Sequence, residues 1–133
     1  SLAVEVRVDG EPPELGDMLL VRGEDLLLQS LFLNLLANAL EAAPEGGTVG
    51  VGLSREERFV RLAVQNMGAV PEAVRGRFFE KYSTHGKEFG TGLGTYAVRL
   101  IAEVHGGSVG FETSEERGTT VWVLLPAQTD PAA

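Results

Sequence analysis

Residues 24–43 read EDLLLQSLFLNLLANALEAA, and this stretch decides the fold. Leucine and alanine fill most of its positions, at the spacing of a long helix. One polar line interrupts them, because Ser30, Asn34 and Asn38 stand four residues apart and Glu41 follows three residues later. Residues at these spacings project from one side of a helix. A helix that is apolar everywhere else is expected to be buried, so its two amides need polar partners. The polar line is the first candidate for a site, and pairing of the amides with nearby backbone alone is the alternative.

The composition bounds the class of protein. The chain has 133 residues, 44% of them hydrophobic and 23% charged, which suits one domain with a core. A net charge of -8 argues against nucleic acid as a partner, because phosphate backbones are bound by surplus Lys and Arg. No apolar run reaches the roughly 18 residues of a membrane span, and we expect neither a span nor a signal peptide. The absence of cysteine suits a reducing compartment.

Strand and helix patterns follow one another along the rest of the chain. The expected strands are 2–8, 18–21, 48–53, 59–64, 108–113 and 119–125. Residues 54–58 and 115–118 are expected to turn two hairpins. The expected helices besides 24–43 are 71–79 and 93–105, and residues 80–91 are expected to form a mobile loop. Phe59, Phe111 and Trp122 stand at strand spacing and are expected in the core.

A glycine-rich segment, GTGLG at 90–94, opens the last predicted helix. Glycine lets the backbone approach a ligand closely, and the free amides of a first helical turn favour an anion. This combination predicts a phosphate site. The spacing alone is a weak signal, because such clusters also form plain turns, and the segment lacks the Gly-Lys-Ser/Thr of a P-loop.

Four segments in this order resemble the ATP-binding catalytic domain of two-component sensor histidine kinases, in the class shared with gyrase, heat-shock chaperone and mismatch-repair ATPases. NLLANA (34–39) looks like the N box, NMGAVP (66–71) the first glycine box, FFEKY (78–82) the F box, and GTGLG (90–94) the second glycine box. Residues 118–126 resemble the closing strand. Four motifs in the family's order are far more specific than any one of them.

The resemblance implies a fold and a function. Residues 1–126 would form one histidine-kinase-like ATP-binding domain, followed by a C-terminal tail at 127–133. The implied fold is a two-layer α/β sandwich of the Bergerat type, a mixed and mostly antiparallel sheet with helices on one face. The implied function is to bind Mg-ATP and donate its γ-phosphate to a histidine on a separate dimerisation domain, with a response-regulator receiver domain as a further partner. A cytoplasmic location is implied, including the cytoplasmic part of a membrane-bound sensor.

Residue by residue, the resemblance assigns Asn38 to Mg²⁺, through its side-chain oxygen, and places Asn34 beside the phosphates, where it acts in catalysis together with Lys87. Asn66 stands where the family usually has an aspartate that receives the adenine amino group, with Gly68 allowing the base to approach. The implied nucleotide-binding residues are Asn34, Asn38, Asn66, Gly68, Lys87, Gly90, Thr91, Gly92, Leu93, Gly94 and Thr119.

The chain departs from the family at three places. The amide of Asn66 replaces an acid and can present either its oxygen or its NH₂ to a base. One residue is missing before Val70 in the first glycine box. Glu41 stands where many members have a lysine near the phosphates, and Lys87 either supplies that cation or is a solvated loop lysine.

Two other functions stay open. One is a nucleotide-binding regulatory module without phosphotransfer. The other is a gyrase-like or chaperone ATPase, against which Asn34 argues, because that class has a glutamate there to activate water. Neither His85, in the predicted loop, nor His105, which is expected to cap a helix C-terminus, is expected to accept phosphate.

Overall fold

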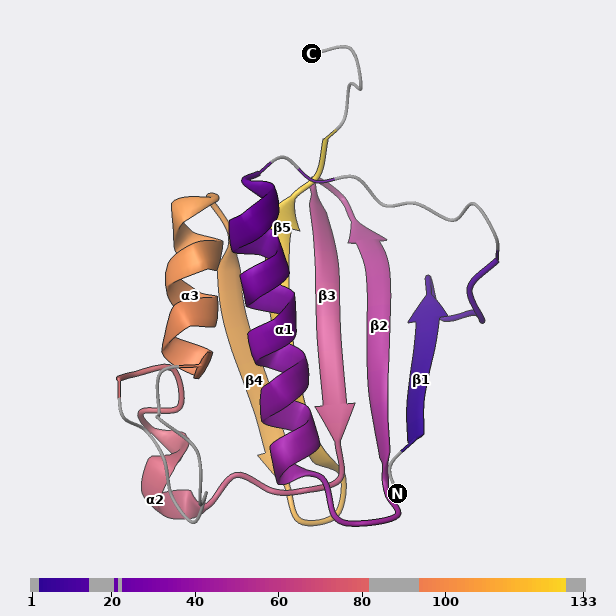
Figure 1. Ribbon diagram of the computed structural model, residues 1–133, viewed down its shortest axis with the longest axis vertical. Helices are drawn as coiled ribbons and strands as arrows, with labels where there is room; N and C mark the ends of the chain where they lie inside the picture. The colour runs from indigo at the N-terminus through magenta and orange to yellow at the C-terminus, as the bar shows by residue number, and fades with distance from the viewer. Residues whose placement is uncertain (1–2, 15–20, 22, 82–93, 129–133) are drawn as a thin grey trace.

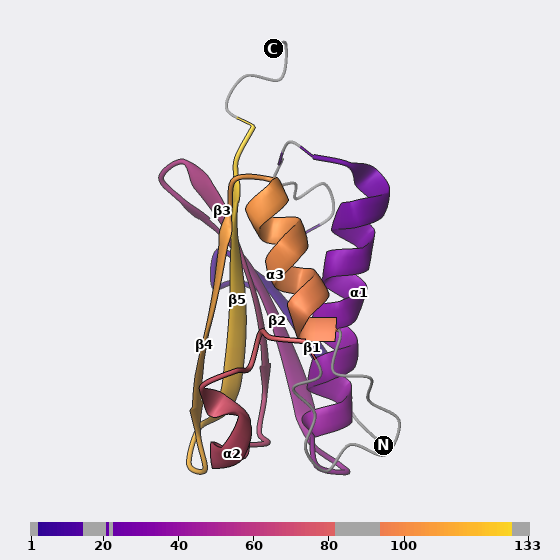
Figure 2. The same cartoon turned by 90° about the vertical axis from the view of Figure 1, so that its left-hand side faces the viewer.

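The computed structural model describes residues 3–14, 21, 23–81 and 94–128. In this part of the chain, five strands form one sheet, and the long helices α1 and α3 pack on one face of it (Figures 1 and 2). The elements are β1 (Ala3–Val8), α1 (Asp25–Ala42), β2 (Thr48–Glu56), β3 (Phe59–Asn66), α2 (Glu72–Arg75), α3 (Gly94–Val104), β4 (Ser108–Ser114) and β5 (Gly118–Pro126). The expected two-layer α/β architecture is confirmed.

The sheet is mixed and mostly antiparallel, as expected. Its strand order is β1-β2-β3-β5-β4, and only the β1-β2 pair is parallel. Parallel neighbours need a crossover connection, and the segment that contains α1 supplies it. The remaining strands form two hairpins, β2-β3 and β4-β5.

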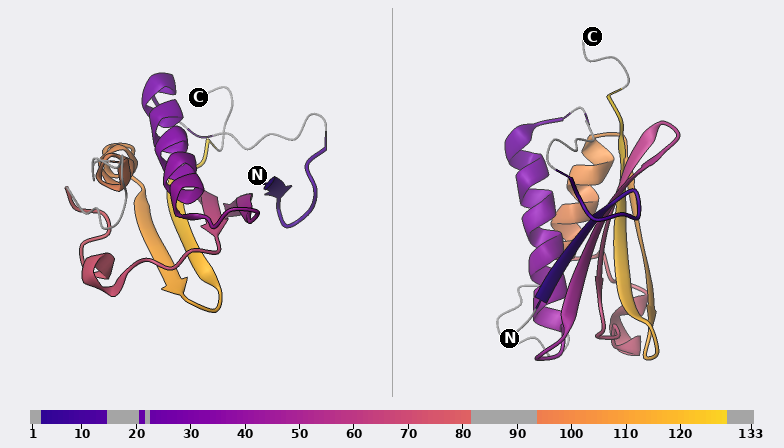
Figure 3. Two further views of the ribbon diagram at one scale, coloured as in Figure 1. Left: turned by 60° about the horizontal axis from the view of Figure 1, so that its bottom comes forward. Right: turned by 90° about the vertical axis from the view of Figure 1, so that its right-hand side faces the viewer.

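The core lies between the sheet and the two helices. Alternate residues are buried along most of the central strands, for example Val49 and Val123, both at 0% exposure. From α1, a line of residues four apart, Leu31, Leu35 and Ala39, packs against them. The expectation that α1 is buried all round was wrong, because Leu26 and Leu33 are 79% and 61% exposed. A helix in a two-layer domain faces the sheet with one side only, as the views in Figure 3 show.

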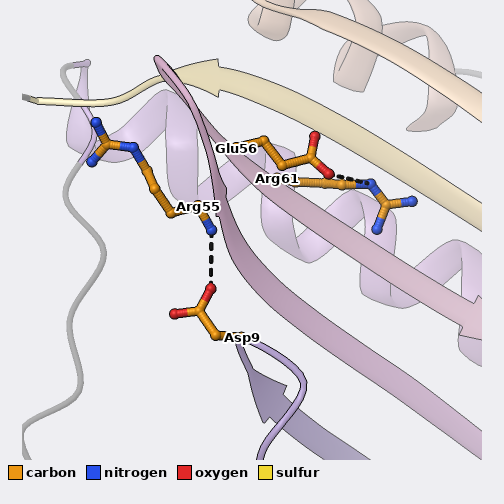
Figure 4. Close-up of polar contacts among 4 residues, drawn as sticks. All are labelled: Asp9, Arg55, Glu56 and Arg61. Carbon is orange, nitrogen blue, oxygen red and sulfur yellow. Dashed lines mark hydrogen bonds and ion pairs between the residues drawn. The ribbon is translucent and has the colours of Figure 1, made fainter.

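The first hairpin is longer than its charged residues indicated. Arg55 and Glu56, expected in the turn, continue β2 and pair with Val60 and Phe59, so the turn itself is tighter. Charged side chains there point into solvent while their backbone stays in the ladder. Glu56 Oε1 lies 4.0 Å from Arg61 Nε (Figure 4).

The end of β1 is fastened to β2 at the same place. The Asp9 N–H donates to the Leu53 carbonyl at 2.7 Å, and the Asp9 carboxylate accepts the Arg55 N–H at 3.1 Å (Figure 4). These bonds use the backbone of an edge strand and so fix where the chain leaves the sheet.

Two further expectations needed correction. The helix expected at 71–79 ends at Arg75, before Gly76, and the chain goes on in turns. Phe111 packs against the core as expected, but Trp122 and Phe59 lie outside the buried cluster and are half-buried. Trp122 stands on the alternate side of β5 from Val121 and Val123, with the Arg61 guanidinium 5.5 Å from its ring centre.

Some predicted segments fall mainly outside the described residues. Of the strand expected at 18–21, only Val21 is described, and it forms a bridge with Ala127. Of the loop expected at 80–91, only Glu80 and Lys81 are described. None of the helices that the structure describes combines the length and the hydropathy needed to cross a membrane.

Candidate functional site

Asn34 lies where α1 meets the first turn of α3. Its Nδ2 donates to the Ser30 carbonyl at 2.8 Å, so the amide nitrogen pairs with the backbone of its own helix. Its oxygen faces α3, because a Cβ added to Gly94 would lie 3.3 Å from Asn34 Oδ1. The structure therefore brings together the N-box amide and the last glycine of the glycine-rich segment.

The first turn of α3 is held by a buried side chain. The Thr95 hydroxyl donates to the Phe78 carbonyl at 2.6 Å and so ties the helix to the segment after α2. Beside it, Tyr96 is half-buried between cations, with Lys81 Nζ 5.1 Å and Arg99 Cζ 5.4 Å from the ring centre. Arg99 Nε also lies 3.6 Å from Glu103 Oε1, so of these two cations Lys81 is the nearer to the first turn of α3, and a first helical turn favours an anion.

Asn66 ends β3 as one of the few buried polar side chains that the structure describes. It is 3% exposed, and its Nδ2 donates to the Ala39 carbonyl of α1 at 3.1 Å. Its Oδ1 is buried without a hydrogen-bond partner. An unpaired buried acceptor costs on the order of 1–3 kcal/mol, so a donor that reaches this oxygen recovers stability.

Thr119 belongs to a directed chain of hydrogen bonds. Its hydroxyl donates to the Gly68 carbonyl at 2.7 Å. The Thr113 hydroxyl, 2.8 Å away, must then donate to Thr119, since a hydroxyl has one hydrogen. Thr113 in turn accepts the Val70 N–H at 2.8 Å. The two threonines thereby fix the segment that follows β3.

Replacing Thr113 with valine is expected to lower the free energy of unfolding by about 1–2 kcal/mol, because the Val70 N–H loses its acceptor while side-chain volume is kept. Urea denaturation measures the change. Thr120→Val is the control, since it makes the same substitution in β5 on the opposite face of the sheet. Equal effects of the two variants would mean that the hydrogen-bond chain contributes nothing of its own.

Gly68 also has a packing role that the sequence did not indicate. A Cβ there would lie 2.2 Å from the Ala42 carbonyl oxygen, so the missing side chain admits the last turn of α1. Close packing against α1 is thus a sufficient reason for glycine at this position. Sequence reasoning missed Thr113, which lies outside the four family motifs, and the Ala39 carbonyl, which is a main-chain group of the N box.

Asn38 lies on α1 between Asn34 and Ala39, and its side chain is half-buried. Among the described residues, no cluster of three or more His, Cys, Asp or Glu could hold a metal ion. Five predicted residues lie outside the described part of the chain: Lys87, Gly90, Thr91, Gly92 and Leu93.

His105 caps the end of α3, as the sequence indicated. Its Nδ1 donates to the Ile101 carbonyl at 2.7 Å, and its Nε2 accepts the Glu24 N–H at 3.1 Å. One imidazole thus serves the last turn of α3 and the first turn of α1. Gly23 makes room for it, because a Cβ there would lie 2.5 Å from the imidazole ring.

Comparison with known proteins gives consistent matches. Residues 23–129 match the family profile "Histidine kinase-, DNA gyrase B-, and HSP90-like ATPase". Sporulation kinase A of Bacillus subtilis is 35% identical over 83% of this chain and 18% of its own length. The mycobacterial sensor histidine kinase MprB superposes with a TM-score of 0.80 and 26% identity, covering 96% of this chain and 84% of that one. The catalytic domain of histidine kinase ThkA gives a TM-score of 0.76 and 28% identity, covering 94% of this chain and 78% of that one. The chain spans about a fifth of the length of the curated relatives that it matches.

Proposed function

Because this chain belongs to the histidine kinase-, DNA gyrase B- and HSP90-like ATPase family, we propose that it binds Mg-ATP and donates the γ-phosphate to a histidine on another domain. That domain would be the dimerisation domain of a longer parent kinase, and a response-regulator receiver domain would be the further partner. The cytoplasm is the proposed location. The observation that carries the proposal is the meeting of Asn34 with the first turn of α3, next to half-buried Asn38.

The described residues support a division of roles. Asn38 would hold Mg²⁺ through its side-chain oxygen, and Asn34 would lie beside the phosphates. The first-turn amides of α3 favour phosphate charge, and Gly94 stands at that turn. Lys87, Gly90, Thr91, Gly92 and Leu93 would complete the phosphate cradle. Magnesium would supply charge neutralisation across the phosphate oxygens.

The base would lie at the C-terminal end of α1, against Asn66, Gly68 and Thr119. The unpaired Asn66 Oδ1 supports this placement, because it is a buried acceptor that the protein leaves open. Catalysis would come mainly from positioning and charge neutralisation, as is general for phosphoryl transfer. The domain would comprise residues 1–126, with 127–133 as a tail.

Asn38→Ala tests the metal assignment. We expect magnesium to tighten ATP binding in the unchanged protein and to do so at least about tenfold less in the variant, because one oxygen ligand is lost. Calorimetric titration with ATP, in magnesium and in EDTA, measures both affinities. The fold should survive, since Asn38 is only half-buried.

Gln29→Ala is the matched control, because it removes an exposed amide from the same helix. A magnesium effect in Asn38→Ala equal to that in the control would remove Asn38 from the metal site. Failure of the unchanged protein to bind ATP under either condition would refute the proposed function itself.

A further inference from the structure

Thr95 is a buried polar side chain in the first turn of α3, at the end of the helix that lies nearer α2 (Figure 1). Its hydroxyl donates to the Phe78 carbonyl at 2.6 Å, which is at the short end of the range for hydrogen bonds between two oxygens. The bond spans 17 positions of sequence. It therefore ties the helix to another segment of the chain and does not cap the helix itself.

The Phe78 end of this bond is held by the sheet. The Phe78 ring stacks on Phe111 of β4, with the ring centres 4.4 Å apart and 28° between the planes. Phe79 meets both rings edge-on, with its ring centre 4.9 Å from that of Phe78 and 5.9 Å from that of Phe111. Aromatic pairs in these geometries stabilise beyond the area that they bury. The carbonyl that receives the Thr95 hydroxyl is thus fixed to β4 by a cluster of three rings.

The opposite end of α3 is held by other contacts. The His105 ring hydrogen-bonds the Ile101 carbonyl and the Glu24 N–H, and the backbone of Gly107 packs closely against the Leu124 carbonyl of β5. A helix that is held only at its C-terminal end can tilt about that end. Because α3 is about 15 Å long, a tilt of about 4° would displace its first turn by about 1 Å.

The first turn of α3 is also the place where α1 comes close. A Cβ added to Gly94 would lie 3.3 Å from Asn34 Oδ1, and the Asn34 amide is itself held by the Ser30 carbonyl at 2.8 Å. The distance between Asn34 and the turn therefore depends on where the turn stands. A misplacement of about 1 Å in a positioning group can cost on the order of 100-fold in rate.

We propose that Thr95 is a positioning residue for phosphate binding, which sets the first turn of α3 against Asn34 through its bond to the Phe78 carbonyl. The single hydroxyl hydrogen of Thr95 is used by Phe78, so the side chain has no donor left for a phosphate oxygen. It acts through the turn that it holds. The inference rests on the proposed function, because it takes nucleotide phosphates to lie at this turn.

Thr95→Val tests the inference, because valine removes the hydroxyl and keeps the shape of the side chain. We expect the affinity for ATP in the presence of Mg²⁺ to fall at least about tenfold, and the affinity for adenosine, which has no phosphate, to fall less than about twofold. Thr95→Ser keeps the hydroxyl and should restore the ATP affinity to within about threefold of that of the unchanged protein. Calorimetric titration measures ATP, with adenosine added as its competitor.

Thr113→Val is the matched control. It makes the same substitution at another threonine hydrogen bond, the one that the Val70 N–H donates, at the end of the sheet where Thr119 and Gly68 lie. Its effect should be the same for both ligands, so the ratio of ATP affinity to adenosine affinity should stay unchanged. An equal fall of this ratio in Thr113→Val and Thr95→Val would overturn the inference, because general destabilisation would then explain both.

Two further results would contradict a positioning role. One is an equal weakening of ATP and adenosine in Thr95→Val, and the other is a serine variant that binds ATP as weakly as the valine variant. Near-ultraviolet circular dichroism checks that each variant is folded. If Thr95→Val does not fold, Thr95→Ser and Thr95→Ala differ only in the hydroxyl and give the same comparison.

The unchanged protein separates this inference from the proposed function. If it does not bind ATP, the proposed function fails. If it binds ATP and Thr95→Val binds ATP equally well, only the present inference fails.

Discussion

Gly118→Ala is expected to lower the free energy of unfolding by about 4 kcal/mol, from a left-handed backbone penalty of about 1 kcal/mol and a clash penalty of about 3 kcal/mol. Gly118 begins β5 with φ at 76°, and an added Cβ would lie 2.0 Å from the Asn66 carbonyl oxygen. Neither atom can yield cheaply, because both belong to paired backbone. A domain is typically stable by 5–15 kcal/mol, so one methyl group would remove much of that margin.

Three other glycines separate the two causes. Gly46 has φ at 79° with open space around its Cβ position, whereas Gly68 meets the Ala42 carbonyl at 2.2 Å without a positive φ. Gly52 has neither feature. Urea denaturation of the four alanine variants should rank Gly118 as the most damaging, then Gly68, then Gly46, with Gly52→Ala neutral or slightly stabilising. If Gly46→Ala lowered the free energy of unfolding as much as Gly118→Ala, the left-handed backbone alone would account for the loss at Gly118.

The order of elements could be predicted from the sequence because it depends on local periodicity. Alternation gave the strands, and leucine spacing gave α1. The turn of the first hairpin was placed too widely, because Arg55 and Glu56 look like turn residues although their backbone pairs with β3. The sequence also indicated a wholly buried α1, because apolar content does not tell how many layers cover a helix.

The candidate site was predicted in part, for a similar reason. Asn34 and Asn38 could be singled out because amides are conspicuous in an apolar helix, whereas Asn66 was assigned through the family resemblance. Which side the Asn66 amide presents depends on the Ala39 carbonyl, 27 residues away in sequence. No side-chain pattern reports a main-chain partner. The chain of hydrogen bonds through Thr113 and the packing of Gly68 against Ala42 are likewise consequences of tertiary contact.

Phosphoryl transfer to a histidine is expected to be absent in this chain alone and to appear when the partner domain is added. The acceptor must stand in line with the γ-phosphate at roughly 3 Å. His105 cannot, because both of its ring nitrogens are hydrogen-bonded at the end of α3. The C-terminal end of α3 lies about 15 Å from the first turn of the same helix, because an α-helix rises 1.5 Å per residue.

The measurement uses radiolabelled Mg-ATP and the histidine-bearing helical hairpin proposed for the parent kinase, supplied as a separate protein. Acid-labile label should appear on the hairpin and not on this chain. Asn38→Ala should slow the labelling in proportion to its loss of magnesium-dependent affinity, and a hairpin without its histidine should take up no label. These controls separate transfer from adventitious binding of nucleotide.

Each outcome selects one function. Acid-labile label on this chain alone would refute an acceptor elsewhere. Release of inorganic phosphate without label on the hairpin would favour an ATPase, against the expectation from Asn34. ATP binding with neither transfer nor hydrolysis would favour the regulatory module, in agreement with the acid at Glu41 and the amide at Asn66. Since positioning supplies most of the rate, transfer to the matched hairpin, and not to an unrelated one, is the result that we expect.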